Sequence, residues 1–522
     1  MKSSFGVFRS CLIIIAFFAV PQTFADIYES VPDWVRIGDG GDFGKSVAMV
    51  GDVNGDGYDD LLIGAETKKV DVEDEGEVYL FFGSATGPTI AFAWSARGGE
   101  LRTFFGSSVA GAGDVNGDGF ADIVLGAKGD SDLGHLTTGE IRLYTGSVEG
   151  PGSTATSTLF GMTQGSWFGS SVAGAGDVDG DGFDDVVVGA PFDSSMKGKN
   201  GAAYIYRGFE GGLLGVPTVL THPTPLGDFG YSVAGAGDVN GDGYADVIVG
   251  QPEYDGSGVQ GGAVHIYFGS ADVSGDAPDW SFTSDQGRQA KFADCVRSAG
   301  DVNGDGFDDI LVGAWRYHVE GQPRGAAFLF LGSEDGPSTE PDWIGYPTNF
   351  GPDYGISDSF YGLSLDSAGD VDGDGLDDVI VGSAGWASAA HPEVFGGIFL
   401  YRGSEHGLKT TPELIVEPPD QPWHEFGRAV AGAGDMNGDG LVDIVGGTPY
   451  HNDGDVTHGA VAVYFGAESD DDDDGDDDED DDDDAGGSGG SGDDEVADVD
   501  VGDEESDDSL RAQDDDSCGC GC

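Results

Sequence analysis

One nine-residue phrase, DxNGDGxxD or its variant DxDGDGxxD, recurs seven times along the chain. Its copies begin at Asp52, Asp114, Asp177, Asp238, Asp301, Asp370 and Asp435. Successive starts are 61 to 69 residues apart. A period this regular indicates a single structural unit repeated seven times, in which each unit buries its apolar surface against a neighbour.

Each period contains the signals of four short β-strands. A Phe-Gly pair such as Phe43-Gly44 precedes the acidic phrase, and a β-branched run such as Asp185 to Val188 follows it. An alternating segment such as Val78 to Ser84 comes third, and a weaker fourth segment often holds Trp. Runs of Val and Ile bounded by Gly favour extended chain. The sequence therefore predicts an all-β fold, a seven-bladed β-propeller of four-stranded blades.

The two ends of the repeat array complement each other. The last repeat stops after its third strand, at Val461 to Phe465, whereas the segment from Pro32 to Val35 resembles the fourth strands at Pro278 to Trp280 and Pro341 to Trp343. An N-terminal strand would thus complete the seventh blade and close the ring, which removes exposed sheet edges. A linear β-solenoid is the alternative architecture.

These features resemble FG-GAP repeats, the units of integrin α-subunit propellers. The resemblance rests on the Phe-Gly start, the acidic loop and a Gly-Ala-Pro end that is complete at residues 189–191. It extends from Trp34 to Gly466, although repeat five begins with Phe292-Ala293 and repeat six with Tyr361-Gly362. It implies a calcium loop in every blade and a ligand surface on the opposite face.

The spacing within each acidic phrase suits Ca²⁺, which prefers six to eight oxygen ligands in a tightly curled loop. Positions 1, 3, 5 and 9 offer side-chain oxygens, position 7 offers a backbone carbonyl, and Gly at position 6 permits the turn. The predicted ligands are Asp52, Asn54, Asp56, Tyr58 and Asp60; Asp114, Asn116, Asp118, Phe120 and Asp122; Asp177, Asp179, Asp181, Phe183 and Asp185; Asp238, Asn240, Asp242, Tyr244 and Asp246; Asp301, Asn303, Asp305, Phe307 and Asp309; Asp370, Asp372, Asp374, Leu376 and Asp378; and Asp435, Asn437, Asp439, Leu441 and Asp443.

Two other interpretations of these loops compete with a calcium-binding hairpin. An EF-hand requires a bidentate Glu at position 12, where this chain has residues such as Ile63 and Val188. A hairpin held by Asx-turns without metal is the second alternative. The seven loops carry 23 carboxylates at positions 1, 3, 5 and 9, which would repel one another without a cation. We therefore expect up to seven calcium ions.

The chain divides by composition into three parts. Residues 1–25 read as a secretory signal peptide, with a buried N-terminal helix as the alternative. Residues 26–467 form the predicted propeller, with a net charge of −50, and residues 468–522 a disordered acidic tail with a net charge of −27. We expect a secreted or cell-surface protein without a transmembrane segment in the mature chain. So negative a chain is expected to bind neither nucleic acid nor an anionic membrane surface.

Three of the five cysteines, Cys518, Cys520 and Cys522, lie at the end of the tail. Surface attachment, metal binding and intermolecular disulfides are three uses that fit them equally well. Cys295 stands alone in the propeller and is expected to be a buried free thiol.

The loops between second and third strands form the face opposite the acidic loops, and they are long and varied. They contain aromatic and His side chains that suit protein or sugar recognition, with packing over the blade ends as the equal alternative. The predicted ligand-binding residues are Tyr254, Trp315, Tyr317, Trp386 and Tyr450, and the same loops hold Phe192, His318, His391 and His451.

The sequence has no pattern typical of a catalytic site, so we expect a non-enzymatic protein. The first hypothesis is a calcium-dependent extracellular adhesion or recognition protein that binds a protein or glycan ligand. The second is a carbohydrate-binding propeller lectin. The third is a non-catalytic accessory propeller of an extracellular enzyme.

Overall fold

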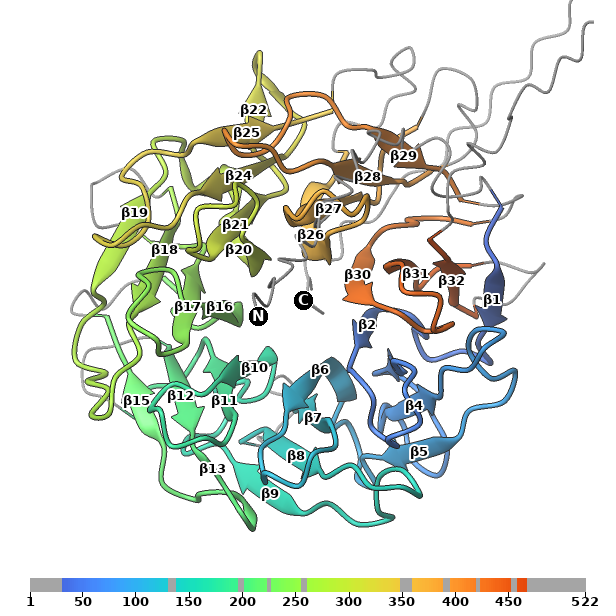
Figure 1. The fold of residues 1–522 in the computed structure, drawn as a ribbon. Coiled ribbons are helices and arrows are strands. Elements are labelled where there is room, and N and C mark those ends of the chain that lie inside the picture. Colours follow the sequence, from blue (N-terminus) through green and yellow to red (C-terminus); the bar gives the residue numbers. More distant parts are fainter. Residues whose placement is uncertain are drawn as a thin grey trace, which may run out of the picture. The chain divides into compact units, whose positions relative to one another are not determined.

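The computed structural model describes residues 31–129, 138–195, 201–222, 227–254, 261–347, 359–387, 395–418, 423–451 and 458–466. Within these ranges the chain forms seven four-stranded antiparallel sheets, set as blades around a central axis (Figure 1). This confirms the predicted seven-bladed propeller. The predicted signal peptide and acidic tail lie outside the described residues.

The blades follow one another in chain order, and each runs from an inner first strand to an outer fourth strand (Figure 1). Blade one comprises β2 (Ser46–Met49), β3 (Leu61–Ala65), β4 (Glu77–Phe81) and β5 (Trp94–Arg97). Blade two comprises β6 (Phe105–Gly113), β7 (Asp122–Ala127), β8 (Glu140–Tyr144) and β9 (Ser157–Phe160). Blade three comprises β10 (Val172–Gly176), β11 (Asp185–Ala190), β12 (Ala202–Tyr206) and β15 (Thr218–Leu220). Blade four comprises β16 (Val233–Gly237), β17 (Asp246–Gln251), β18 (Ala263–Tyr267) and β19 (Trp280–Thr283).

Blades five to seven repeat the same order. Blade five comprises β20 (Phe292–Gly300), β21 (Asp309–Ala314), β24 (Ala326–Phe330) and β25 (Trp343–Gly345). Blade six comprises β26 (Tyr361–Gly369), β27 (Asp378–Ser383), β28 (Ile398–Tyr401) and β29 (Leu414–Val416). Blade seven comprises β30 (Ala429–Gly434), β31 (Asp443–Thr448), β32 (Ala460–Tyr464) and β1 (Trp34–Ile37). The loops also contain two small hairpins. These are β13–β14 (Gly208–Phe209 and Gly212–Leu213) and β22–β23 (His318–Val319 and Gln322–Pro323).

The N-terminal strand closes the ring as predicted. β1 pairs antiparallel with β32, and Trp34 lies opposite Val463 in the register. Asp33 extends this pairing, because its Oδ2 accepts a hydrogen bond from the backbone N–H of Phe465 at 2.8 Å. The outer edge of β32 is therefore covered by a strand from the other end of the chain.

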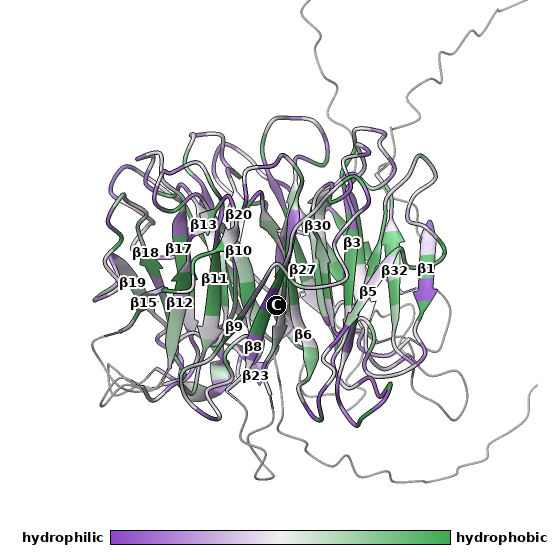
Figure 2. Ribbon diagram, turned by 90° about the horizontal axis from the view of Figure 1, so that it is seen from below, coloured by the Kyte–Doolittle hydropathy of each residue, from purple (hydrophilic) through white to green (hydrophobic). Residues whose placement is uncertain are grey.

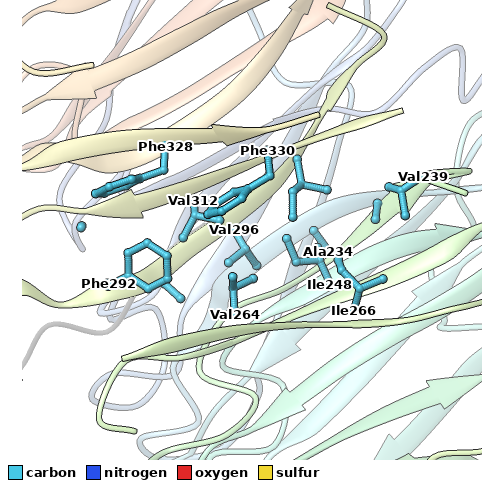
Figure 3. Packing of buried hydrophobic residues seen from close by; sticks show 14 of the residues in the cluster. Ala234, Val239, Ile248, Val264, Ile266, Phe292, Val296, Val312, Phe328 and Phe330 are labelled. Carbon is cyan, nitrogen blue, oxygen red and sulfur yellow. The ribbon is translucent and has the colours of Figure 1, made fainter. Parts of the chain in front are cut away.

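The hydrophobic core is divided into seven clusters, one between each pair of neighbouring blades. Figure 3 shows the cluster between blades four and five, where Ile248 and Val264 face Val312, Phe328 and Phe330. Second and third strands such as β3 and β4 are buried along their whole length, because both of their faces meet a neighbouring blade. Hydrophilic loops occupy the two rims of the ring (Figure 2).

Four of the fourth strands contribute a Trp that packs edge-on against the third strand of the next blade. Trp94 contacts Tyr144 with ring centroids 4.8 Å apart, and Trp34 contacts Phe81 at 5.3 Å. Trp280 with Phe330 and Trp343 with Tyr401 repeat the contact. Trp34 thus makes at the ring closure the contact that the other three make between consecutive blades.

Cys295 is buried as a free thiol in the cluster between blades five and six, as the sequence predicted. Among the described residues, no helix has the length and apolar content that a membrane span requires.

The closure can be tested with a matched pair of substitutions. Trp34→Ala and Trp94→Ala each remove one half-buried indole from an edge-on aromatic contact, at a cost of about 1.5–3 kcal/mol each. We expect the two variants to lower the unfolding midpoint in guanidinium to a similar extent. A Trp34→Ala variant as stable as the parent would show that β1 does not close the ring in solution.

Candidate metal centre

The acidic loops connect the first and second strands of each blade, so all seven lie on one face of the ring. In blade one the loop spans residues 52–60, between β2 and β3. Asp52 organises this loop: its Oδ1 accepts the N–H groups of Gly55 and Asp56 at 2.6 and 3.0 Å, and its Oδ2 accepts that of Gly57 at 2.7 Å. The first carboxylate therefore curls the chain around itself.

Positions 3 and 5 are held beside each other. Asn54 donates from Nδ2 to Oδ2 of Asp56 at 2.9 Å, while its Oδ1 accepts the Asp56 N–H at 2.9 Å. The equivalent amide-to-carboxylate bond occurs in the four other loops that have Asn at position 3, at 2.7 to 3.1 Å. The side-chain oxygens of positions 1, 3 and 5 thus come from a single turn of chain.

The ninth position lies beneath the loop and is buried in every blade. Asp60 accepts the N–H of Val53 on Oδ2 and the N–H of Gly83 on Oδ1, both at 3.0 Å. The same pair of bonds is made by Asp122, Asp185, Asp246, Asp309, Asp378 and Asp443. The ninth carboxylate therefore ties the loop to the turn that follows the third strand of its own blade.

Burial of this carboxylate has an electrostatic consequence. Loss of hydration raises the pKa of Asp60, Asp122, Asp185, Asp246, Asp378 and Asp443 to about 7, and that of Asp309 to about 8. The neighbouring carboxylates at positions 1 and 5 raise it further in loop one. A divalent cation would oppose this effect by stabilising the ionised form.

The donor set fits a hard divalent cation. In loop three, oxygens of Asp177, Asp179 and Asp185 lie within 4.8 Å of one another, and in loop six the same holds for Asp370, Asp372 and Asp374. Oxygens at this separation can share one Ca²⁺, whose ligand distances are about 2.3–2.6 Å. The other five loops have the same first, fifth and ninth carboxylates with an amide oxygen at position 3.

Neighbouring loops are joined into a belt by backbone hydrogen bonds. The N–H of position 8 donates to the position-1 carbonyl of the preceding blade at six junctions, for example from Ala121 to Asp52 at 3.1 Å. The closing junction is one of the six, from Asp59 to Asp435 at 3.0 Å. The loops therefore form a chain of contacts around the face rather than seven independent turns.

Where position 8 is Asp, its side chain makes a second bond across the junction. Oδ2 of Asp184 accepts the N–H of Asp114 at 2.7 Å, and Asp59, Asp308 and Asp377 bind their preceding loops in the same way. Sequence reasoning assigned no role to this position. The sequence does contain a sign of this role, because position 8 is Asp in four repeats and Ala or Val in the other three.

The seventh position also reaches the preceding loop. A Cβ placed on Gly55 would lie 2.6 Å from the ring of Phe120, and similar overlaps link five more pairs of neighbouring loops. Gly55 itself has φ of +74°, a conformation that disfavours other residues. In these six loops Gly at position 4 is therefore favoured both by the turn and by the side chain at position 7 of the next blade.

Comparison with known proteins agrees with this architecture. The FG-GAP repeat model matches residues 43–81, 105–144, 168–206, 229–267 and 298–330, and the FG-GAP-like repeat model matches residues 370–446. The chain belongs to the FG-GAP repeat proteins. Its propeller is of the integrin-α type, as the sequence had indicated.

Integrin α-chains are among the similar proteins. Integrin alpha-V of Gallus gallus is 34% identical over 216 residues, integrin alpha pat-2 of Caenorhabditis briggsae 34% over 226, and integrin alpha-5 of Xenopus laevis 32% over 217. These matches cover 39–40% of this chain and 17–20% of the relatives, so the similarity spans about a fifth of their length. Among solved structures, a crystal structure of BBS1N in complex with ARL6DN contains a chain that is 10% identical to this one, with a TM-score of 0.44. The superposition covers 83% of this chain and 96% of that chain.

On the opposite face of the propeller, two of the predicted ligand-binding residues are buried. Trp315 is 6% exposed and donates from Nε1 to Asp294, and Trp386 is 3% exposed and packs on Phe399. Both loops fold back over the ends of their blades, which is the packing alternative. Tyr254 and Tyr317 are half-buried, and Tyr450 is 37% exposed.

Of the remaining residues in these loops, Phe192 is 40% exposed, His318 is half-buried and His451 is buried, whereas His391 lies outside the described residues. Phe192 packs edge-on against Trp167 at 4.7 Å. The Lys128 ammonium lies 5.7 Å from the Trp167 ring and 5.6 Å from the Phe104 ring. An accessible aromatic cluster of Phe104, Trp167 and Phe192 therefore lies on blades two and three, away from the five predicted ligand-binding residues.

The ninth carboxylates predict an unusual pH dependence for the metal-free protein. Their folded pKa values of about 7 to 8 exceed the unfolded value of 3.8, so the folded state binds more protons between these limits. Stability from this source is complete below about pH 4 and is lost as the pH rises towards 8. We expect the melting temperature in calcium-free buffer to fall by several degrees between pH 5.5 and 8, and a rise over this interval would contradict the assignment.

Proposed function

We propose that this FG-GAP propeller is a non-enzymatic extracellular recognition or adhesion module, and that its acidic loops hold up to seven calcium ions. The observation that carries the proposal is the belt of seven loops, each with four side-chain oxygen donors at positions 1, 3, 5 and 9, and with three carboxylates within 4.8 Å of one another in loops three and six. The similarity to integrin α-chains supports a recognition role on the cell surface or outside the cell.

Bound Ca²⁺ would supply positive charge at the centre of each loop. The residues proposed to hold it are those of positions 1, 3, 5 and 9, together with the position-7 carbonyl, as numbered for the seven loops above. The loop N–H groups orient the first carboxylate, and the buried ninth carboxylate links the loop to its own blade. Because adjacent loops share backbone hydrogen bonds, order in one loop supports its neighbours around the belt.

Calcium should stabilise the propeller through linkage, since an ion that binds only the folded state adds RT ln(1 + [L]/Kd) per site. At a calcium concentration ten times Kd, each site contributes about 1.4 kcal/mol. We expect EGTA to lower the melting temperature by about 10 °C or more at pH 7.5, and added Ca²⁺ to restore it. Mg²⁺ at equal concentration serves as the control, and an EGTA melt that matches the calcium melt would contradict calcium binding.

We place the ligand surface on the face opposite the calcium loops, around the accessible aromatic cluster of blades two and three. Aromatic side chains with a nearby cation suit both protein hot spots and sugar stacking. Glu66 holds the cation of this cluster in place. Its Oε2 lies 3.0 Å from Nζ of Lys128, and its Oε1 lies 2.5 Å from Nζ of Lys45. Burial alone would raise the pKa of Glu66, but the two ammonium groups lower it to about 2.

Substitutions at exposed and buried aromatics can separate binding from packing. Phe192→Ala should reduce binding of the propeller to a panel of immobilised extracellular-matrix proteins and glycans by about tenfold, with an unchanged melting temperature. Trp386→Ala removes a buried indole and should instead cost about 3–5 kcal/mol of stability. Inhibition by free monosaccharide would identify a lectin. Full binding by Phe192→Ala would remove the cluster from the ligand surface.

A further inference from the structure

The seven acidic loops fall into two classes that differ at two positions together. Five loops have Asn at position 3, whereas loops three and six have Asp179 and Asp372. In these two blades, and in no other, the residue after the third strand is Arg, namely Arg207 and Arg402. At the same place the Asn-containing blades have uncharged residues, which are Phe82, Thr145, Phe268, Leu331 and Phe465.

The two substitutions meet in space. Nη1 of Arg207 lies 2.8 Å from Oδ2 of Asp179, and Nε of Arg402 lies 2.7 Å from Oδ2 of Asp372. The two Asp side chains are only 7% and 2% exposed. The Arg402 side chain is 7% exposed and that of Arg207 is 30% exposed, so salt screens the pair of loop six weakly and that of loop three somewhat more.

Each Arg compensates for the extra carboxylate that its loop carries at position 3. In the Asn loops the position-3 side chain donates to the position-5 carboxylate, as Asn116 does to Asp118 at 2.9 Å. Asp cannot make this donation, and it adds a fourth carboxylate to positions 1, 3, 5 and 9. The guanidinium pairs with this added carboxylate and supplies a compensating positive charge. Counted over these positions and the Arg, every loop of the propeller therefore carries a net charge of −3.

We propose that Arg207 and Arg402 are built-in counter-cations that hold their loops at this common charge and thereby set the affinity of blades three and six for a divalent cation. The inference rests on the proposed calcium binding. A cation in loop three must share Asp179 with Arg207 and also approaches a fixed positive charge, so removal of the guanidinium should strengthen cation binding in that loop alone.

The test is a calcium titration followed by hydrogen exchange of individual peptides from the full-length protein, so that each loop has its own midpoint. Arg207→Phe installs the residue found in blades one, four and seven. We expect it to lower the calcium midpoint of the peptide covering residues 177–185 about tenfold, with much smaller shifts in the adjoining loops two and four and none in the other four loops. Asp179→Asn alone leaves a loop of charge −2 and should raise the same midpoint about tenfold.

Two further variants control for indirect effects. The double variant Asp179→Asn with Arg207→Phe recreates the common loop type, and its midpoint should return to within about threefold of the parent. Thr145→Arg places a guanidinium beside the Asn-containing loop of blade two, and it should weaken calcium binding at residues 114–122. Melting curves in EGTA verify that each variant is folded.

The outcomes separate the two proposals. Calcium responses in all seven loops, together with an Arg207→Phe midpoint equal to or higher than that of the parent, would overturn the counter-cation assignment and leave calcium binding intact. A double variant whose midpoint differs tenfold or more from that of the parent would overturn it as well, because the two changes together restore the charge of the common loop type. Absence of any calcium response in the parent protein would overturn both proposals.

Discussion

Each blade of this propeller has two apolar faces, and neither can be covered from within the blade. Strands β3 and β4 are buried at every residue, which is possible only because another blade lies on each side. Exposed apolar surface costs about 25 cal/mol per Å². An uncovered blade face would therefore cost a large part of the net free energy of unfolding of a domain. The chain meets this requirement by closing into a ring, and β1 supplies the strand without which blade seven would have an open edge.

Closure has an electrostatic cost, because it gathers all the acidic loops on one face. The backbone can satisfy the hydrogen bonds of these carboxylates, and the N–H groups around Asp52 and Asp60 show how completely it does so. It cannot remove their charge. The ninth carboxylates respond with raised pKa values, which is how a buried anion without a counter-ion lowers its energy. A divalent ion in the loop is the alternative solution, and it is the one that we propose for neutral pH.

The sequence was sufficient for the ring and for the composition of the loops, because both depend on patterns within one repeat. The Trp at the fourth strand of several repeats was enough to identify Trp34 as part of blade seven. Features that depend on contacts between repeats were not accessible in this way. Asp184 binds the loop of blade two rather than its own, and Trp315 and Trp386 look like exposed loop residues until the loops are seen to fold back.

The comparison of the seven loops indicates which property is held constant on the face that carries them. Loops three and six differ from the others at two positions that lie 28 and 30 residues apart in sequence, and each pair meets in a short ion pair. If only the oxygen donor at position 3 mattered, Asp could replace Asn without a second change. If only blade packing mattered, the residue after the third strand would remain uncharged, as it does in Phe82 and Leu331. Both changes occur together, which is expected when the quantity that matters is the charge of the loop. Equal charge at the proposed ligand positions would attract cations to each loop to a similar degree, so no single blade would draw ions away from its neighbours.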